Sequence, residues 1–379
     1  MRHSRRLAVL CLVACAFASA HAALPIPKPP AIDARALILI DHDSGRVLAE
    51  SNADERMEPA SLTKVMTGYI AFEALKDGRL TLTEEIPISE RAWKSEGSRS
   101  FVQVGTRIPV EVLLKGMIVQ SGNDATIALA ERLGGSEEGF AQIMNAYAKK
   151  LGMRNTNYEN STGLPGANHY TTARDMATLA RAVIRDYPEY YQWYSLREFV
   201  WNNIRQQNRN GLLARDASVD GIKTGHTESA GYCLATSAKR DGMRLVSAVF
   251  GTKSMRARED ASAALLNYGF TFYETVKLKG RGETVLAPRL YKGEEENIAI
   301  GPRADVYVTV GRGDAAQVTT AATANEPLLA PADPATAAGE LVVSVGNDVV
   351  SRVPLYPLKA VPEGGWWTRM IDGLLLMWH

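Results

Sequence analysis

The sequence "EPASLTKVMTGYI" occupies residues 58–70 and places a serine, Ser61, three positions before a lysine, Lys64. The apolar run that follows predicts a helix over residues 61–76, which Gly78 ends. Because residues i and i+3 share one face of a helix, the Lys64 Nζ can approach the Ser61 Oγ closely enough to take its proton. Serine is also a preferred helix N-cap, so the pair alone does not separate a nucleophile with its base from a capped helix.

Length and composition narrow the classes of protein to consider. The chain has 379 residues, which favours two domains over one, and 46% of them are hydrophobic, which is enough for substantial cores. A formal net charge of +1 and the lack of a dense Lys/Arg run exclude a nucleic-acid partner. The spacing of His, Cys and Asp fits no metal site, so neither a metal nor another cofactor is expected.

Residues 1–22 have the pattern of a secretory signal peptide: a basic start, a short apolar core and a small-x-small ending. The apolar core is too short to span a bilayer comfortably, which argues against a permanent anchor; an uncleaved leader is the alternative. Cleavage would remove Cys11 and Cys15 and leave Cys233, which we interpret as a buried structural thiol in a strand.

Hairpins at both ends of a helical middle predict an α+β (α/β) fold, with an antiparallel sheet covered by helices. The expected hairpins cover residues 36–52 and 231–252, and the expected helices cover residues 61–76, 110–120, 123–135, 172–186 and 258–274. From about residue 277 short β-like runs alternate with turn residues, which predicts a small all-β domain ending near residue 362.

Two further motifs bear on the role of Ser61. Ser121-Gly122-Asn123 interrupts a helical pattern, and "GIKTGHT", residues 221–227, enters an apolar strand pattern. There Lys223 and Thr224 alternate in direction, and Gly225 lets a ligand backbone approach the strand closely. S-x-x-K, S-x-N and K-T-G in this order resemble the serine penicillin-recognising enzymes.

Within that group the chain resembles the low-molecular-mass penicillin-binding proteins that are D-alanyl-D-alanine carboxypeptidases of the peptidase S11 type. The likeness extends through "HYTTARDMA", "NRNGLL" and "DGIKTGHT". It implies a signal peptide at 1–22, a catalytic domain at 23–276, a β-rich domain at 277–362 and a membrane-anchoring amphipathic helix at 363–379. A class A β-lactamase would need an E-x-x-L-N segment, which does not follow the S-x-N turn; Glu159 and Asn160 lack that spacing.

Acyl transfer assigns a role to each motif. We expect Ser61 to be the nucleophile and neutral Lys64 its base, with the pKa of Lys64 lowered by burial and by a positive neighbour such as Lys223. Ser121 can relay a proton to the leaving amine, and Asn123 can hold the substrate amide and Lys64. The resemblance implies an oxyanion hole formed by the backbone N–H groups of Ser61 and His226.

A substrate that ends in D-Ala-D-Ala carries a free carboxylate, which needs cations and hydroxyls near the strand. The strand residues Lys223, Thr224 and Thr227 are candidates. The resemblance places the carboxylate-binding arginine at Arg258; Arg256 is an alternative, and Arg209 can support the same edge of the site.

The C-terminal segment predicts an amphipathic helix that is too short to span a bilayer and fits a membrane interface. Its apolar face comprises Trp366, Trp367, Met370, Ile371, Leu374, Leu375 and Trp378, with Arg369 and Asp372 opposite. The alternative is a helix packed on the protein's own core.

These features predict a peripheral protein on the periplasmic face of the bacterial inner membrane. It would remove the terminal D-alanine from peptidoglycan pentapeptide stems and be acylated by β-lactams. The alternatives are a DD-endopeptidase acting on cross-linked peptidoglycan and a penicillin-acylated sensor that turns over no peptide.

Overall fold

The computed structural model of the chain describes residues 25–377. The predicted signal peptide and Trp378 therefore lie outside the described residues.

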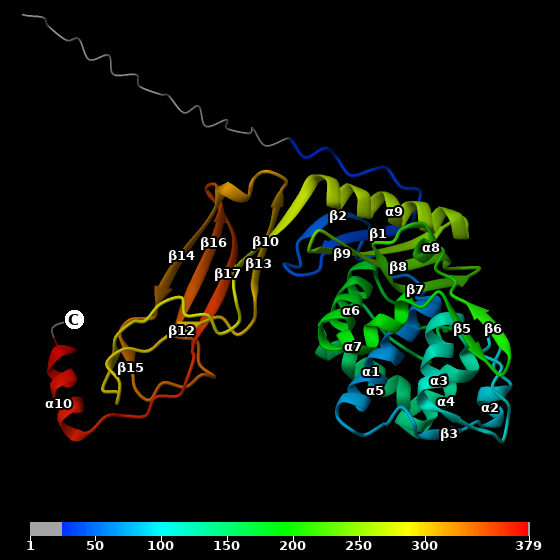
Figure 1. The fold of residues 1–379 in the computed structure, drawn as a ribbon, viewed down its shortest axis with the longest axis horizontal. Helices are drawn as coiled ribbons and strands as arrows, with labels where there is room; N and C mark the ends of the chain where they lie inside the picture. The colour runs from blue at the N-terminus through cyan, green and yellow to red at the C-terminus, as the bar shows by residue number, and fades with distance from the viewer. Residues whose placement is uncertain (1–24, 378–379) are drawn as a thin grey trace, which may run out of the picture.

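The centre of the N-terminal part is a five-stranded antiparallel sheet (Figure 1) with the strand order β2-β1-β9-β8-β7. Its strands are β1 (Ala36–Asp41), β2 (Val47–Ser51), β7 (Val219–Thr227), β8 (Gly231–Arg240) and β9 (Met243–Thr252). Both predicted hairpins are confirmed, since β1 pairs with β2 and β8 pairs with β9. The pairing of β1 with β9 joins these two hairpins, which are distant in the sequence, into one sheet.

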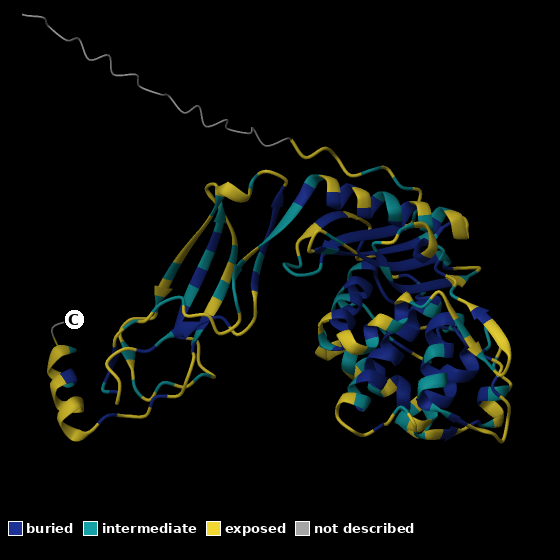
Figure 2. Cartoon of the chain, in the orientation of Figure 1, coloured by how far each residue is buried: buried dark blue, intermediate teal, exposed yellow. Residues whose placement is uncertain are grey.

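Helices cover both faces of this sheet, as Figures 1 and 2 show. Successive side chains of a strand point to opposite faces, so Ile38 and Ile40 of β1 enter the larger helical core, whereas Leu37 and Leu39 pack with α9. The helices of the larger core side are α1 (Lys64–Lys76), α2 (Glu90–Trp93), α3 (Val110–Lys115), α4 (Asn123–Gly134), α5 (Glu137–Lys150), α6 (Ala173–Asp186) and α7 (Pro188–Tyr191). The opposite face is covered by α9 (Met255–Phe272), and α8 (Leu212–Arg215) precedes β7.

The predicted bounds of α9 were wrong at both ends. The helix begins at Met255 because the Ser254 side chain accepts a hydrogen bond from the Ala257 N–H and caps it. It ends at Phe272, since Tyr273 already begins β10 (Tyr273–Lys279), which pairs with β13 (Val306–Gly311). The chain thus passes from the helix into the C-terminal β-structure without a linker.

The C-terminal part is built from strands around a separate apolar core that includes Val308, Leu341 and Leu355. A four-stranded sheet with the order β12-β17-β16-β14 forms most of it. Its strands are β12 (Ile300–Gly301), β14 (Val318–Ala324), β16 (Gly339–Val345) and β17 (Asp348–Pro357). Three short pairs complete the strands of the described chain: β3 (Glu85–Pro87) with β4 (Arg107–Pro109), β5 (Glu198–Trp201) with β6 (Ile204–Gln207), and β11 (Leu290–Tyr291) with β15 (Leu328–Leu329).

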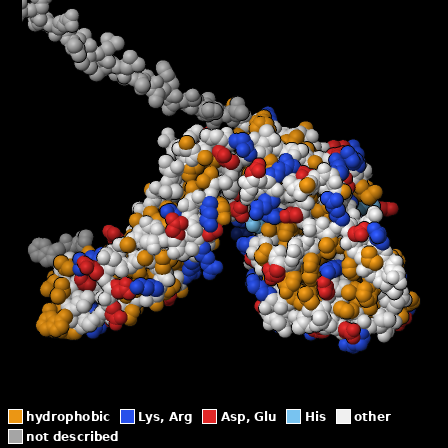
Figure 3. Space-filling view, in the orientation of Figure 1, with side chains coloured by type: hydrophobic (Ala, Val, Ile, Leu, Met, Phe, Trp, Pro, Cys, Tyr) orange, Lys and Arg blue, Asp and Glu red, His pale blue; other side chains and the backbone are white. Residues whose placement is uncertain are grey.

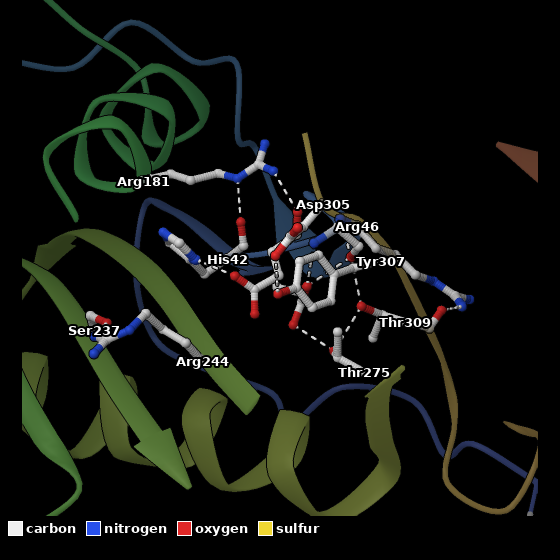
Figure 4. A network of polar contacts seen from close by, with 12 residues as sticks. His42, Arg46, Arg181, Ser237, Arg244, Thr275, Asp305, Tyr307 and Thr309 are labelled. Atoms are coloured by element: carbon white, nitrogen blue, oxygen red, sulfur yellow. Dashed lines mark hydrogen bonds and ion pairs between the residues drawn. The ribbon is translucent and has the colours of Figure 1, made fainter. Parts of the chain in front are cut away.

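A polar network joins the two parts (Figure 4). The buried Asp41 at the end of β1 accepts a hydrogen bond from the Thr275 hydroxyl at 2.7 Å. Ser44 contacts the Thr309 hydroxyl at 2.6 Å, and Arg46 donates to the Thr309 carbonyl at 2.6 Å. Because Asp41 is fully buried, its carboxylate depends on these partners, and the first hairpin is fixed against β10 and β13.

The last described helix, α10 (Trp366–Leu375), lies at the far end of the β-structure (Figure 1). Asp372 is buried and accepts hydrogen bonds from Arg289 at 3.0 Å and from the Lys292 N–H at 2.5 Å. Seven large apolar side chains of this segment are 41–80% exposed, and hydrophobic side chains gather at this end in Figure 3. Within residues 25–377, no helix combines the length and hydrophobicity needed to cross a membrane.

Candidate active site

Ser61 lies in a single 3₁₀ turn, Ala60–Thr63, and the α-helix itself begins at Lys64. The prediction that the α-helix starts at Ser61 was therefore wrong by three residues. Side chains at i and i+3 eclipse one another in a 3₁₀ turn, so this turn places Lys64 directly beside Ser61. The Lys64 Nζ lies 3.0 Å from the Ser61 Oγ.

The backbone immediately before the serine is strained. Ala60 has φ +46°, a left-handed value that residues with a Cβ rarely adopt. Two glycines allow the surrounding chain to pack on this turn: a Cβ on Gly163 would lie 1.8 Å from the Ala60 carbonyl oxygen, and one on Gly225 would lie 3.1 Å from the Pro59 carbonyl oxygen. Gly225 thus packs against the turn that carries Ser61. The sequence had led us to expect a ligand backbone at this face of Gly225.

Lys64 is buried, and its Nζ also contacts the Thr162 carbonyl oxygen at 2.6 Å. Burial, followed by the positive charge of Arg209, lowers the pKa of Lys64 to about 7, while the charges of Asp124 and Glu137 oppose this shift. A substantial share of Lys64 is therefore neutral near pH 7. The positive neighbour expected from the sequence was Lys223, whereas the neighbour that lowers this pKa is Arg209.

The rate of acylation should follow the titration of Lys64. With neutral Lys64 as the expected base, kcat/KM for acylation should rise about tenfold per pH unit below pH 7 and level off above it, because kcat/KM reports the free enzyme. Stopped-flow measurement of acylation by a chromogenic β-lactam between pH 5 and pH 9 gives the profile. A rate that stays flat across this range, or that falls as the pH rises, contradicts a basic role for Lys64.

Ser121 lies at the same site. It follows the helical turn Gly116–Gln120 and precedes α4. It adopts φ +65°, and its buried Oγ has no hydrogen-bond partner within the described chain. Asn123 begins α4, and its amide nitrogen donates to the Glu96 carbonyl at 2.6 Å. Asn123 is therefore held by the loop before α3, and the unpaired Ser121 hydroxyl is available to a substrate.

The K-T-G motif lies on a strand, β7, as predicted, and the structure places this strand at the edge of the sheet. Lys223 is buried, and its Nζ donates to the Thr224 carbonyl at 3.1 Å. Burial first, and then the charges of Lys64, Arg209 and Arg258, hold the pKa of Lys223 well below its ordinary value. Thr227 accepts a hydrogen bond from the Ala230 N–H and donates to Glu58 at 3.1 Å, so it closes the β7–β8 turn.

Arg258 reaches the cavity from the first turns of α9. It is buried, and it donates to the Gly225 carbonyl at 3.1 Å and to the Arg209 carbonyl at 3.3 Å. Burial lowers the pKa of the Arg258 guanidinium from its usual value. Arg256 instead has a side chain that is 69% exposed and paired with Asp260 at 3.1 Å. The geometry thus favours Arg258 over Arg256 as the arginine that faces a ligand.

One cavity of about 590 Å³ is lined by several of these groups. Its lining comprises Ser61, Gly97, Ser98, Ser121, Arg209, Thr224, Gly225, His226, Tyr232, Met255 and Arg258. Lys64, Asn123, Lys223 and Thr227 were also predicted and do not line it. Of these four, Lys64, Asn123 and Lys223 are buried, and Lys64 contacts Ser61 directly.

Several residues of the site escaped sequence reasoning. Gly97 and Ser98 come from an irregular loop, and Met255 precedes the expected start of α9. Tyr232 could have been found from the hairpin register, since it stands opposite His226. Asn160, considered only for a β-lactamase motif, accepts a hydrogen bond from the Gly163 N–H at 2.7 Å and so shapes the loop that carries Thr162.

Among residues 25–377, no group of three or more His, Cys, Asp and Glu side chains could hold a metal ion.

Comparison with known proteins gives matches along both parts of the chain. The family model described as D-alanyl-D-alanine carboxypeptidase matches residues 24–254, and that described as penicillin-binding protein 5, C-terminal domain, matches residues 273–363. D-alanyl-D-alanine carboxypeptidase DacA of Escherichia coli K12 is 40% identical over 392 residues, covering 100% of this chain and 97% of the relative. DacC of the same organism is 41% identical, covering 95% and 92%.

Solved structures agree with these sequence matches. Penicillin-binding protein 5 from Haemophilus influenzae has a TM-score of 0.83 and 38% identity, covering 89% of this chain and 100% of that one. The carboxypeptidase DacD from Francisella tularensis has a TM-score of 0.72 and 34% identity, covering 89% and 96%.

Proposed function

Because the chain belongs to the D-alanyl-D-alanine carboxypeptidase (peptidase S11) family, we propose that Ser61 is the nucleophile with which it removes the terminal D-alanine of peptidoglycan stems. The enzyme is a serine D-alanyl-D-alanine carboxypeptidase. The single observation that carries the residue assignment is the 3.0 Å contact between the Ser61 Oγ and a lysine whose pKa is about 7.

In the proposed acylation, Lys64 first accepts a proton from Ser61 and later returns it to the leaving group. Neutral Lys64 takes the Ser61 hydroxyl proton while the Oγ attacks the carbonyl carbon between the two D-alanines. The tetrahedral oxyanion accepts hydrogen bonds from the backbone N–H groups of Ser61 and His226. When the C–N bond breaks, the proton held by Lys64 passes through Ser121 to the leaving amine, and Ser61 is left as an ester.

Hydrolysis of the ester completes the turnover. Lys64, neutral again, can remove a proton from an attacking water, and the ester C–O bond breaks as Ser61 regains its hydrogen. The unpaired hydroxyl of Ser121 and its place on the cavity wall support its role as a relay.

A defined peptidoglycan pentapeptide tests the proposed function. Mass spectrometry before and after incubation should show loss of one alanine from the monomeric pentapeptide. A cross-linked muropeptide dimer that is split while the monomer stays intact would indicate an endopeptidase. A penicillin adduct without turnover of either peptide would indicate a sensor.

Arg258 is the group that we propose for the terminal carboxylate. Replacing it with alanine should lower kcat/KM for a free-acid peptide about 10²-fold, because the substrate carboxylate would lose its charged partner in a buried site. In this variant Thr224 and the other residues that line the cavity remain to contact the rest of the substrate.

The comparison substrate is the same peptide with a C-terminal amide, for which the charge contact does not exist. Arg256→Ala is the matched control, because that arginine is exposed and paired with Asp260. Equal losses by Arg258→Ala on acid and amide, or a larger acid-specific loss in Arg256→Ala, would move the carboxylate site away from Arg258.

We further propose that residues 1–22 export the protein and that α10 holds it on the periplasmic face of the inner membrane. The latch formed by Asp372, Arg289 and the Lys292 backbone supports this, since it turns the polar face of α10 toward the β-structure. The seven exposed apolar residues of this segment are Trp366, Trp367, Met370, Ile371, Leu374, Leu375 and Met377.

Removal of residues 365–379 should release the protein from lipid vesicles while leaving D-alanine release unchanged. Each large apolar side chain contributes about 1.5–3 kcal/mol when fully buried and less at interfacial depth, so the attraction is mainly hydrophobic. Vesicle sedimentation of full-length and truncated protein measures this. Continued sedimentation of the truncated form, or release of the full-length form by high salt alone, would contradict the anchor.

A further inference from the structure

Tyr232 lies between His226 of the K-T-G strand and Arg258 of α9 and contacts both side chains. It lies on β8, directly opposite His226 of β7 in the antiparallel register. The two rings pack against each other in a tilted arrangement, with centroids 4.1 Å apart and an interplanar angle of 33°. Both residues line the cavity that contains Ser61. The side chain of His226, whose backbone N–H we assign to the oxyanion hole, is thus packed on the ring of Tyr232.

The ring of Tyr232 also contacts the proposed carboxylate-binding group. The Arg258 guanidinium carbon lies 5.7 Å from the ring centroid, within the range of a cation–π interaction. The other contacts of this guanidinium are the Gly225 and Arg209 carbonyls, and its buried Nε has no partner within the described residues. Two carbonyl oxygens and one aromatic ring therefore set the direction in which Arg258 points.

From this geometry we propose that Tyr232 is a positioning residue that aligns Arg258 with the oxyanion hole at His226. The proposal rests on the proposed function, in which Arg258 binds the terminal carboxylate. In that substrate the carboxylate and the carbonyl under attack belong to neighbouring residues, so their binding groups must keep a fixed spacing. The ring of Tyr232 lies against the Arg258 guanidinium and against the imidazole of His226, so it can fix the spacing between these two residues.

Recognition of the carboxylate by Arg258 then also aligns the scissile carbonyl for attack by Ser61, which is how binding energy at a remote group can raise kcat. The ring carries this role, because within residues 25–377 the Tyr232 hydroxyl makes no hydrogen bond to a protein group. A phenylalanine at this position should therefore preserve the effect, whereas an aliphatic side chain should not.

The test compares Tyr232→Leu with the matched variant Tyr232→Phe on two peptides, a free acid and its C-terminal amide. For the free acid, we expect Leu to lower kcat/KM about tenfold, with part of the loss in kcat, and Phe to stay within about twofold of wild type. For the amide, Leu should cost little. In an Arg258→Ala background, Tyr232→Leu should add no further acid-specific loss.

Three results would overturn the proposal: equal losses on acid and amide, a Phe variant as impaired as the Leu variant, or an undiminished Leu effect in the Arg258→Ala background. Thermal unfolding of each variant controls for folding. If Tyr232→Leu lowers the unfolding midpoint, Tyr232→Met repeats the comparison with another non-aromatic side chain of a volume similar to that of leucine. If Arg258→Ala alone shows no preference between acid and amide, the carboxylate assignment fails and the coupling fails with it. An acid-specific Arg258 effect that is independent of Tyr232 refutes the coupling alone.

Discussion

Alanine at position 61 should abolish D-alanine release and β-lactam acylation, with a loss in kcat of about 10⁶-fold, the scale seen when a serine nucleophile is removed. Ser61 lines the cavity, and its Oγ lies 3.0 Å from the Lys64 Nζ. Without its oxygen no ester can form, and the remaining donors can only bind the substrate. Intact-protein mass spectrometry with benzylpenicillin and a D-alanine assay measure both losses.

Ser121→Ala is the matched control, because it removes the other serine hydroxyl that we assign to the chemistry. This variant should still be acylated at Ser61, but more slowly by about 10²-fold or more, since proton transfer by a positioned group contributes on this scale. Retained acylation in Ser61→Ala together with complete loss in Ser121→Ala would exchange the two roles.

Arginine in place of Lys64 should lower the acylation rate by about 10³–10⁴-fold, the contribution expected of a positioned general base. A guanidinium stays protonated at any pH that the protein tolerates, so it cannot take the serine proton. Lys64 in the native protein differs in that burial and Arg209 lower its pKa to about 7. The guanidinium is also larger than the buried ammonium group that contacts the Thr162 carbonyl oxygen.

Lys76→Arg provides the control for this substitution, because Lys76 ends the same helix on the surface. The control should acylate at the wild-type rate, and the pH dependence should be unchanged. Acylation of Lys64→Arg near the wild-type rate would remove Lys64 from the role of base and direct attention to Lys223, the other buried lysine of the site.

Local patterns predicted most of the catalytic fold. The two hairpins, the break at Ser121 and the helix at residues 172–186 follow from turn residues and apolar periodicity, and the structure confirms them. Element boundaries were less predictable. The 3₁₀ turn at Ala60–Thr63 reflects packing against β7 and the Gly163 loop, which are distant in sequence. The domain division at residue 276/277 stays a prediction.

The same distinction holds for the site. The three motifs predicted Ser61, Lys64, Ser121 and Lys223 because acyl transfer requires their residue types. Partners supplied by distant loops could not be found this way. Thr162 contacts Lys64 through its backbone carbonyl, which any residue could offer, and no motif shows that Arg209 approaches Lys64.

The central claim is that Ser61, activated by Lys64, carries the acyl group. The most direct measurement is proteolysis of the acid-quenched benzylpenicillin adduct followed by tandem mass spectrometry of the modified peptide. The account predicts a single penicilloyl group on Ser61. A penicilloyl group on Ser98, Ser121 or any other residue, with Ser61 unmodified, would contradict it.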